Sequence, residues 1–203
     1  MTETRIIIFA KAPQPGLAKT RLIPALGAEG AASLARRMLE TTLQRALRAR
    51  TGPVELRVTP VISDSAWSDF PIPQNVEIRF QGEGDLGARL ALAAKSGLEC
   101  NTAVMLIGCD CPQLDSTALQ EAAQILRGVD AVMHPTADGG YALLGLRRFD
   151  PRLFNDIPWS TNSVARRTVQ RLGALQWSLH VAALFNDVDE PADLRCLPAE
   201  WLP

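Results

Sequence analysis

Apolar residues follow two patterns along the chain. Short apolar or β-branched runs predict strands, and apolar positions three or four residues apart predict helices. The expected strands are residues 6–9, 54–62, 76–80, 103–107, 131–133, 141–146 and 178–183. The expected helices are residues 27–50, 88–98, 116–127, 163–172 and 192–197. Strands that alternate with helices predict an α/β fold with a mostly parallel sheet. Residues 103–107 are apolar at every position, as in a central strand buried on both faces.

Bulk composition indicates one globular domain over residues 1–203, because 47% of the residues are hydrophobic and the formal net charge is −1. A near-neutral protein is not expected to bind nucleic acid by charge. The longest apolar runs are far shorter than the roughly 18 residues that span a bilayer. The apolar stretch near the start is also too short for a secretory signal. We therefore expect a cytoplasmic protein with no membrane span.

The cysteines and histidines exclude two kinds of site. Four cysteines do not make a disulfide framework in a chain of 203 residues, and Cys109 and Cys111 lack a second pair for zinc. There are only two histidines, and no Gly-x-Ser-x-Gly motif accompanies them. Reduced structural thiols are expected, and a serine hydrolase is not.

The first expected strand runs directly into a turn that carries Lys11, Lys19 and Arg21. The whole chain has only three lysines, and two of them lie in this turn. Ligands of open α/β sheets bind at the carboxyl ends of the strands. Cations at this edge favour an anionic ligand, most naturally a phosphate, over an ordinary solvated loop.

Asp110 follows the central strand, and Pro112 prevents the chain from continuing in the sheet. Asp115 and Ser116 are better placed to cap the next helix, so Asp110 is free for another role. A carboxylate at this edge suits Mg²⁺ or Mn²⁺, which bind through one or two carboxylates together with substrate phosphates.

A second carboxylate cluster lies near the end of the chain, at Asp187 and Asp189, followed by Pro191. Alone, the cluster would be the capped start of a helix. A cation that bridges phosphates needs a second ligand, however, and either aspartate could supply it.

Asp138, Gly139 and Gly140 lie between two expected strands. The two glycines could form a two-residue hairpin turn, or they could let the backbone approach a ligand closely. In the second case Asp138 could bind a substrate hydroxyl or act as a general base.

Residues 82–87 match the Gly-x-Gly-x-x-Gly motif of dinucleotide-binding proteins. Glu83 and Asp85, however, put two negative charges at the helix N-terminus where a pyrophosphate would bind. A dinucleotide-dependent oxidoreductase is therefore disfavoured. The opening turn is also no P-loop, because two residues separate Gly16 from Lys19.

Six motifs in order resemble a bacterial family of glycosyltransferases, some of them called selenodomain-associated or arsenosugar-biosynthesis transferases. The family lies within the nucleotide-diphospho-sugar transferase superfamily. The motifs are at residues 11–22, 84–87, 107–112, 138–141, 159–161 and 187–189. The resemblance implies the GT-A fold, a Rossmann-like three-layer α/β/α sandwich.

The resemblance also implies a role for each motif. The residues that would bind the nucleotide and its phosphates are Lys11, Gly16, Lys19, Arg21, Gly84, Asp85 and Gly87. The residues that would border the sugar or the acceptor are Gly139, Gly140, Tyr141, Trp159 and Thr161. Asp110 would hold the metal, with Asp189 or Asp187 as the second ligand, and the catalytic residues would be Asp110, Asp138 and Lys19.

One departure from the family pattern keeps the reaction type open. Many GT-A glycosyltransferases carry Asp-x-Asp after the central strand, whereas this chain has Asp110 alone between two cysteines. A single aspartate resembles the nucleotidyltransferase branch, and the start of the chain is similar to 2-phospholactate guanylyltransferases.

Three functions follow. The favoured one is a transferase dependent on Mg²⁺ or Mn²⁺ that moves a glycosyl group from a nucleotide sugar to a small-molecule acceptor. The alternatives are a nucleotidyltransferase, which uses a nucleoside triphosphate and releases pyrophosphate, and a nucleotide-binding module without turnover.

Overall fold

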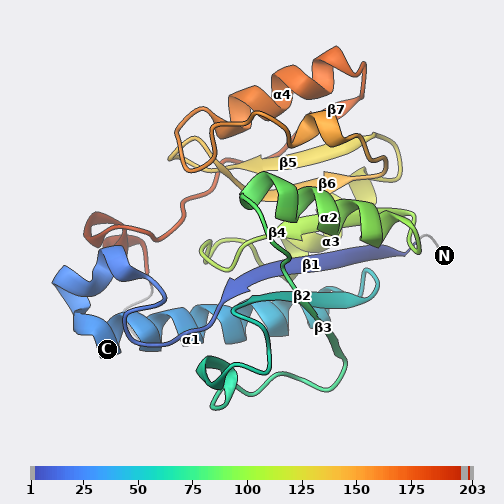
Figure 1. The fold of residues 1–203 in the computed structure, drawn as a ribbon. Coiled ribbons are helices and arrows are strands. Elements are labelled where there is room, and N and C mark those ends of the chain that lie inside the picture. Colours follow the sequence, from blue (N-terminus) through green and yellow to red (C-terminus); the bar gives the residue numbers. More distant parts are fainter. Residues whose placement is uncertain (1–2, 198–200, 202–203) are drawn as a thin grey trace.

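A seven-stranded sheet runs through the centre of the molecule in the order β3-β2-β1-β4-β6-β5-β7 (Figure 1). The computed structural model describes residues 3–197 and 201. The strands are β1 (Thr4–Lys11), β2 (Val54–Thr59), β3 (Val76–Phe80), β4 (Ala103–Ile107), β5 (Ala131–Pro135), β6 (Tyr141–Leu146) and β7 (Leu179–Val181). Only β6 runs antiparallel to its neighbours, β4 and β5. The sheet is therefore mostly parallel, as the sequence pattern predicts.

Helices cover both faces of this sheet (Figure 1). The α-helices are α1 (Ile23–Ala49), α2 (Leu86–Leu98), α3 (Ser116–Ile125) and α4 (Val164–Ala174). Short 3-10 helices are η1 (Thr20–Leu22), η2 (Ser65–Trp67), η3 (Pro151–Leu153) and η4 (Pro191–Cys196). One core cluster joins α1 and α3 to the sheet, and a second joins α2 and α4 to its other face. Among the described residues, no helix combines the length and apolar character needed to cross a bilayer.

Most expected elements are present, and the differences have local causes. The first helix begins four residues earlier than expected, with a proline in its first turn, and a break at Gly27 (φ 70°) interrupts it. β2 stops at Thr59 because Pro60 has no N–H for the ladder. The helix expected at residues 192–197 is instead the short 3-10 helix η4.

The carboxyl ends of β1, β2, β3 and β4 lie at one edge of the sheet because these strands are mutually parallel. β4 is buried at all five positions, so the chain reaches this edge at Gly108 directly from the core. The segment after β7 returns to the same edge, where the Val188 N–H donates to the Asp110 carbonyl over 2.9 Å.

Val188 also anchors this returning segment through its side chain. It is fully buried in a cluster with Leu22 before α1, Leu34 and Met38 on α1, and Leu197. In Figure 1 the red C-terminal segment accordingly lies beside the blue beginning of α1. The returning segment and the beginning of α1 are thus packed together next to Asp110.

We expect Val188→Ala to lower the free energy of unfolding by about 2 kcal/mol, because it removes buried methyl groups and leaves a cavity. The matched control is Val181→Ala, since Val181 is 54% exposed. Urea denaturation measures both variants. Equal effects of the two substitutions would contradict the anchoring role of Val188.

Candidate functional site

A cavity of about 470 Å³ lies at the carboxyl edge of the sheet. We call it the loop cavity, because residues 17–21 of the opening loop form one wall. The charged residues that line it are Lys11, Lys19, Arg21, Asp110, Asp138 and Asp189. The structure therefore brings all three predicted cations together with three of the five predicted carboxylates.

Lys19 lies at the centre of this cluster. Its Nζ atom lies 2.5 Å from Asp110 Oδ1 and 2.8 Å from Asp189 Oδ1, and it donates to the Val188 carbonyl over 2.5 Å. The Lys19 side chain is only 7% exposed. Its backbone is left-handed (φ 50°, ψ 38°), which costs about 1 kcal/mol for a residue with a Cβ. These contacts compensate that strain.

The two carboxylates keep Lys19 charged. Burial alone would lower the pKa of Lys19, but attraction and hydrogen bonds to Asp110 and Asp189 raise it above its ordinary value. The ammonium is thus a fixed positive charge between two carboxylates.

Asp187 belongs to the same acidic cluster. Burial, and then the negative charge of Asp138, with smaller contributions from Asp189 and Asp193, raise the pKa of Asp187 to about 6. This carboxyl therefore ionises close to neutral pH, and its protonation depends on the charges around it.

The donor chemistry around Asp110 fits a divalent cation. Asp110 and Asp189 both contact one point charge, the Lys19 ammonium, so a single cation can lie between them. No group of three or more His, Cys, Asp or Glu side chains with metal-site geometry occurs within the described part of the chain. Two carboxylates nevertheless suffice for Mg²⁺ when substrate phosphates supply further ligands.

Asp138 lies in the loop between β5 and β6. Its Oδ1 atom accepts hydrogen bonds from the Thr136 hydroxyl (2.5 Å) and the Gly140 N–H (2.9 Å), which leaves Oδ2 for another partner. Pro135 pairs with Tyr141, so the hairpin loop covers residues 136–140. The two-residue turn considered for this hairpin is therefore wrong.

Two further cavities adjoin the loop cavity. The tryptophan cavity, about 290 Å³, has apolar walls that include Leu86, Leu90 and Trp159. The small cavity, about 130 Å³, lies between Cys111, Thr136 and Asp187. Asp110 and Asp138 line all three cavities. Among the residues that the structure describes, the charged ones lining the tryptophan and small cavities are all carboxylates, namely Asp110, Asp138 and Asp187.

The glycine motifs have packing roles. A Cβ atom on Gly87 would lie 2.4 Å from Trp159 Nε1, and one on Gly139 (φ +92°) would lie 2.2 Å from the Asn162 carbonyl oxygen. The Ala165 N–H also donates to the Gly139 carbonyl. The segment at 159–162 therefore packs closely against the first turn of α2 and against the loop that carries Asp138.

Several predicted residues do not line these cavities. The predicted site residues that line at least one of the three cavities are Lys11, Lys19, Arg21, Asp110, Asp138, Gly140, Tyr141, Trp159, Thr161, Asp187 and Asp189. Gly16, Gly84, Asp85, Gly87 and Gly139 are not among the lining residues. Asp85 instead caps α2, because its Oδ1 atom accepts from the Ala88 N–H.

Sequence reasoning missed three participants: Phe9 and Gln81, which line the loop cavity, and the Val188 carbonyl. Ser160 of the motif at 159–161 also lines this cavity. Gln81 follows a strand, which was an available signal. It is buried, and its amide donates to the carbonyls of Ala10 and Arg57. Nothing in the local sequence distinguishes the Val188 carbonyl.

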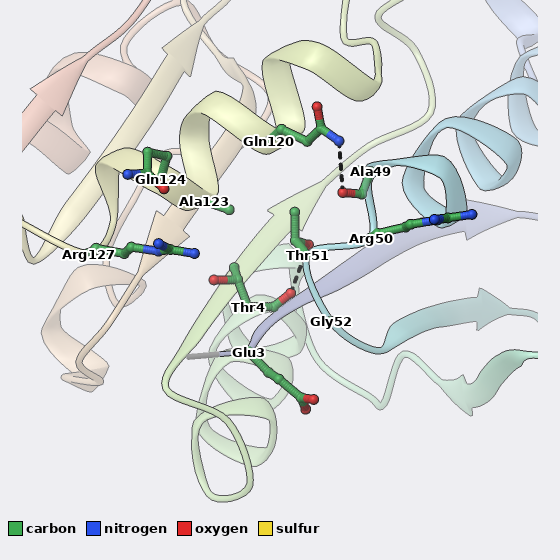
Figure 2. A pocket seen from close by; sticks show the side chains of 10 residues that line it. All are labelled: Glu3, Thr4, Ala49, Arg50, Thr51, Gly52, Gln120, Ala123, Gln124 and Arg127. Atoms are coloured by element: carbon green, nitrogen blue, oxygen red, sulfur yellow. Dashed lines mark hydrogen bonds between the residues drawn. The ribbon is translucent and has the colours of Figure 1, made fainter. Parts of the chain in front are cut away.

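Another cavity, about 350 Å³, lies at the opposite edge of the sheet, near the ends of α1 and α3 (Figure 2). None of the predicted site residues lines it. Gln120 donates to the Ala49 carbonyl, and the Thr51 hydroxyl donates to the Thr4 carbonyl (Figure 2). Helix C-termini disfavour anions, so this cavity is a poor site for phosphates.

Comparison with known proteins finds a matching family model and several structures with a similar fold. A family model described as "Uncharacterized protein conserved in bacteria (DUF2064)" matches residues 42–161. A crystal structure from Desulfovibrio desulfuricans G20, provisionally named a nucleotide-diphospho-sugar transferase, is 31% identical and has a TM-score of 0.86. The match covers 94% of this chain and 84% of that one. No curated protein matches the chain.

More distant structures share the fold. CMP:2-keto-3-deoxy-manno-octonic acid synthetase complexed with CTP is 14% identical, with a TM-score of 0.60 and 96% coverage of both chains. The Mycobacterium tuberculosis H37Rv protein Rv0371c in complex with manganese is 17% identical, with a TM-score of 0.59 and coverage of 97% of this chain and 98% of that one. The expected Rossmann-like α/β fold of nucleotide-diphospho-sugar transferases is thereby confirmed.

We expect Gly139→Ala to lower the free energy of unfolding by about 2–4 kcal/mol, because the new Cβ is strained by the positive φ and meets Asn162. The matched control is Gly173→Ala in α4, where nothing lies within 4 Å of an added Cβ. That control should gain up to about 1 kcal/mol. Chemical denaturation decides, and loss of stability in both variants would contradict the packing role of Gly139.

In protein free of divalent cations, we expect Asp187→Asn to gain stability over the wild type as the pH rises from about 4 to 7. Asp187 holds its proton more tightly in the folded protein (pKa about 6) than an unfolded carboxyl does. The wild type therefore loses stability as the pH rises and Asp187 is deprotonated, whereas the Asn side chain does not titrate. Urea denaturation across this pH range measures the difference. The control is Asp69→Asn at an exposed aspartate. If the difference in unfolding free energy between the Asp187 variant and the wild type does not change with pH, the raised pKa of Asp187 is contradicted.

Proposed function

The chain belongs to the DUF2064 family of bacterial proteins, and from this premise we propose that it is a metal-dependent glycosyltransferase that uses a nucleotide sugar. Similarity to the D. desulfuricans protein supports a nucleotide-activated donor. The observation that carries the proposal is the separation of charge around Asp110 and Asp138. Three cations line the loop cavity beside three carboxylates, whereas the charged residues lining the other two cavities, within the described part of the chain, are carboxylates alone.

The loop cavity would hold the diphosphate of the donor. Lys11 and Arg21 are exposed along its wall, and their charges complement those of phosphate oxygens. In glycosyl transfer negative charge grows on the leaving phosphate, so fixed cations there stabilise the transition state more than the ground state.

Asp110 and Asp189 would hold Mg²⁺ or Mn²⁺, with Asp187 close enough to influence the site by its charge. When bound, the cation would neutralise charge on the donor phosphates. The manganese complex of the structurally similar M. tuberculosis protein is in keeping with this proposal but concerns that protein.

The tryptophan cavity would receive the acceptor. Within the described ranges, its charged lining residues are Asp110 and Asp138, so a phosphate or carboxylate on the acceptor would be repelled and a neutral hydroxyl compound accepted. The acceptor oxygen would bond to the anomeric carbon as the bond to the donor phosphate breaks. The nucleotide would leave with the electron pair, and Asp138 Oδ2 would take the hydroxyl proton.

Nucleotidyl transfer is the second candidate, because the fold is shared with a synthetase that was crystallised with CTP. In that reaction an acceptor attacks the α-phosphorus of a triphosphate and pyrophosphate leaves. A phosphorylated acceptor would have to enter cavities whose charged lining residues are carboxylates, so the charge distribution favours glycosyl transfer.

The deciding experiment incubates the protein and Mn²⁺ with nucleotide sugars and, separately, with nucleoside triphosphates. Slow hydrolysis of the donor by water makes the assay independent of the acceptor. We expect nucleotide sugars to raise the melting temperature and to release their nucleotide. Release of pyrophosphate from a triphosphate would overturn glycosyl transfer, and binding without release, even after Asp110→Asn with Asp189→Asn, would indicate a nucleotide-binding module.

We expect Asp138→Asn to reduce transfer or hydrolysis by about 100-fold or more, because the proton acceptor is lost. Thermal protection by the nucleotide sugar should persist, since Asp138 is not proposed to contact the donor phosphates. Asp69→Asn, at an exposed aspartate outside the three cavities, is the matched control and should leave both readouts unchanged. Full activity in the Asp138 variant would exclude it as the base.

A further inference from the structure

Lys19 cannot bind a donor phosphate in the arrangement that the structure shows. A lysine ammonium has three N–H donors and no acceptor. The Lys19 ammonium already has three acceptors, namely the carboxylates of Asp110 and Asp189 and the carbonyl of Val188. No donor remains for a phosphate oxygen.

The same ammonium also occupies the position proposed for the divalent cation. It contacts Asp110 Oδ1 at 2.5 Å and Asp189 Oδ1 at 2.8 Å, and a cation held by both carboxylates must lie between the same two side chains. Two like charges cannot share that position, because their repulsion at such a separation is large.

We infer that Lys19 takes the place of the divalent cation while the donor site is empty, and moves to the donor phosphates when cation and nucleotide bind together. The inference rests on the cation site of the proposed function. A cation alone must displace a well-paired ammonium. A cation that arrives with a diphosphate also supplies the new acceptors that the ammonium then needs.

The surroundings of Lys19 permit this exchange. The side chains of Asp110 and Asp189 are 44% and 41% exposed, so a cation can reach them from the loop cavity. Lys19 lines the same cavity as Lys11 and Arg21. Its side chain therefore borders the space in which the donor phosphates would lie.

The consequence is a coupling between the two ligands. Binding of the nucleotide removes Lys19 from the carboxylates and so strengthens cation binding, and by linkage the cation strengthens nucleotide binding by the same factor. Lys19 thus weakens the binding of a divalent cation in the absence of the nucleotide.

The direct test titrates the protein with Mn²⁺ alone and measures the free ion by its electron paramagnetic resonance signal. We expect Lys19→Met to bind Mn²⁺ about tenfold more tightly than the wild type, because the competing ammonium is gone. Lys95→Met on α2 makes the same change in net charge outside the three cavities and should leave the affinity unchanged. An unchanged affinity in the Lys19 variant overturns the inference.

Lys11→Met distinguishes two explanations for a change in Mn²⁺ affinity. One is competition by the Lys19 ammonium for the cation position, and the other is the repulsion of Mn²⁺ by any positive charge nearby. Lys11 lines the same cavity but is exposed, so its loss should change Mn²⁺ affinity by less than about twofold through screened charge alone. If Lys11→Met tightens Mn²⁺ binding as much as Lys19→Met does, this repulsion explains the effect and the inference fails.

A second measurement on the wild-type protein covers the case in which Lys19→Met does not fold, as judged by circular dichroism. The chain has only three lysines, so ¹⁵N-detected ammonium signals can be assigned with Lys11→Met and Lys95→Met. We expect Mg²⁺ with inorganic pyrophosphate to shift the Lys19 signal and Mg²⁺ alone at the same concentration to leave it in place. A Lys19 signal that stays in place with both ligands bound overturns the inference.

Neither readout requires turnover, so the two proposals can fail separately. If Lys19→Met binds Mn²⁺ more tightly but the wild type transfers no glycosyl group, the inference about Lys19 is supported and the proposed glycosyl transfer is contradicted. Glycosyl transfer with unchanged Mn²⁺ affinity would do the reverse. Absence of Mn²⁺ binding in every variant would overturn the inference together with the proposed cation site.

Discussion

A buried ammonium group must find acceptors, and the arrangement of this site follows from how Lys19 finds them. Its side chain is 7% exposed, and an unpaired charge at such a position would cost several kcal/mol. The acceptors come from the end of β4 and from the segment after β7, so that segment must lie against Asp110. Val188 secures it twice, by its N–H to Asp110 and by its buried side chain. Packing and charge therefore stabilise the same arrangement.

This arrangement separates the charges of the site. The end of β1 and the opening loop contribute the cations, which line the loop cavity together with three carboxylates. Among the described residues, only carboxylates supply charge to the other two cavities. Close packing of Trp159 on Gly87, and of Asn162 on Gly139, holds the apolar walls beside the carboxylates. A donor rich in phosphate and an acceptor without phosphate are the ligands that such a site would distinguish. The Lys19 ammonium contacts Asp110, which lines all three cavities.

Most of the fold and part of the site were predictable from local pattern. The bounds of β3, β4 and β6 agree with the predicted ranges, because apolar runs and turn residues act over a few positions. The cations of the opening turn and Asp110 were found because they follow strands, and strand ends of a parallel sheet meet at one edge. The glycine motifs were interpreted as ligand contacts, yet Gly87 and Gly139 pack against other segments. A motif alone does not distinguish these two reasons for a glycine.

By itself, the sequence determined the order of strands and helices along the chain, the edge of the sheet at which the candidate residues gather, and the residue types available there. These properties depend on neighbours within a few positions along the chain. Only the tertiary structure decided that Lys19 pairs with Asp189 and Val188, which are 170 and 169 residues away. Contacts across such separations leave no local pattern, because they depend on where packing brings the returning segment. The same packing decided that one ammonium lies between the two carboxylates proposed to hold a cation.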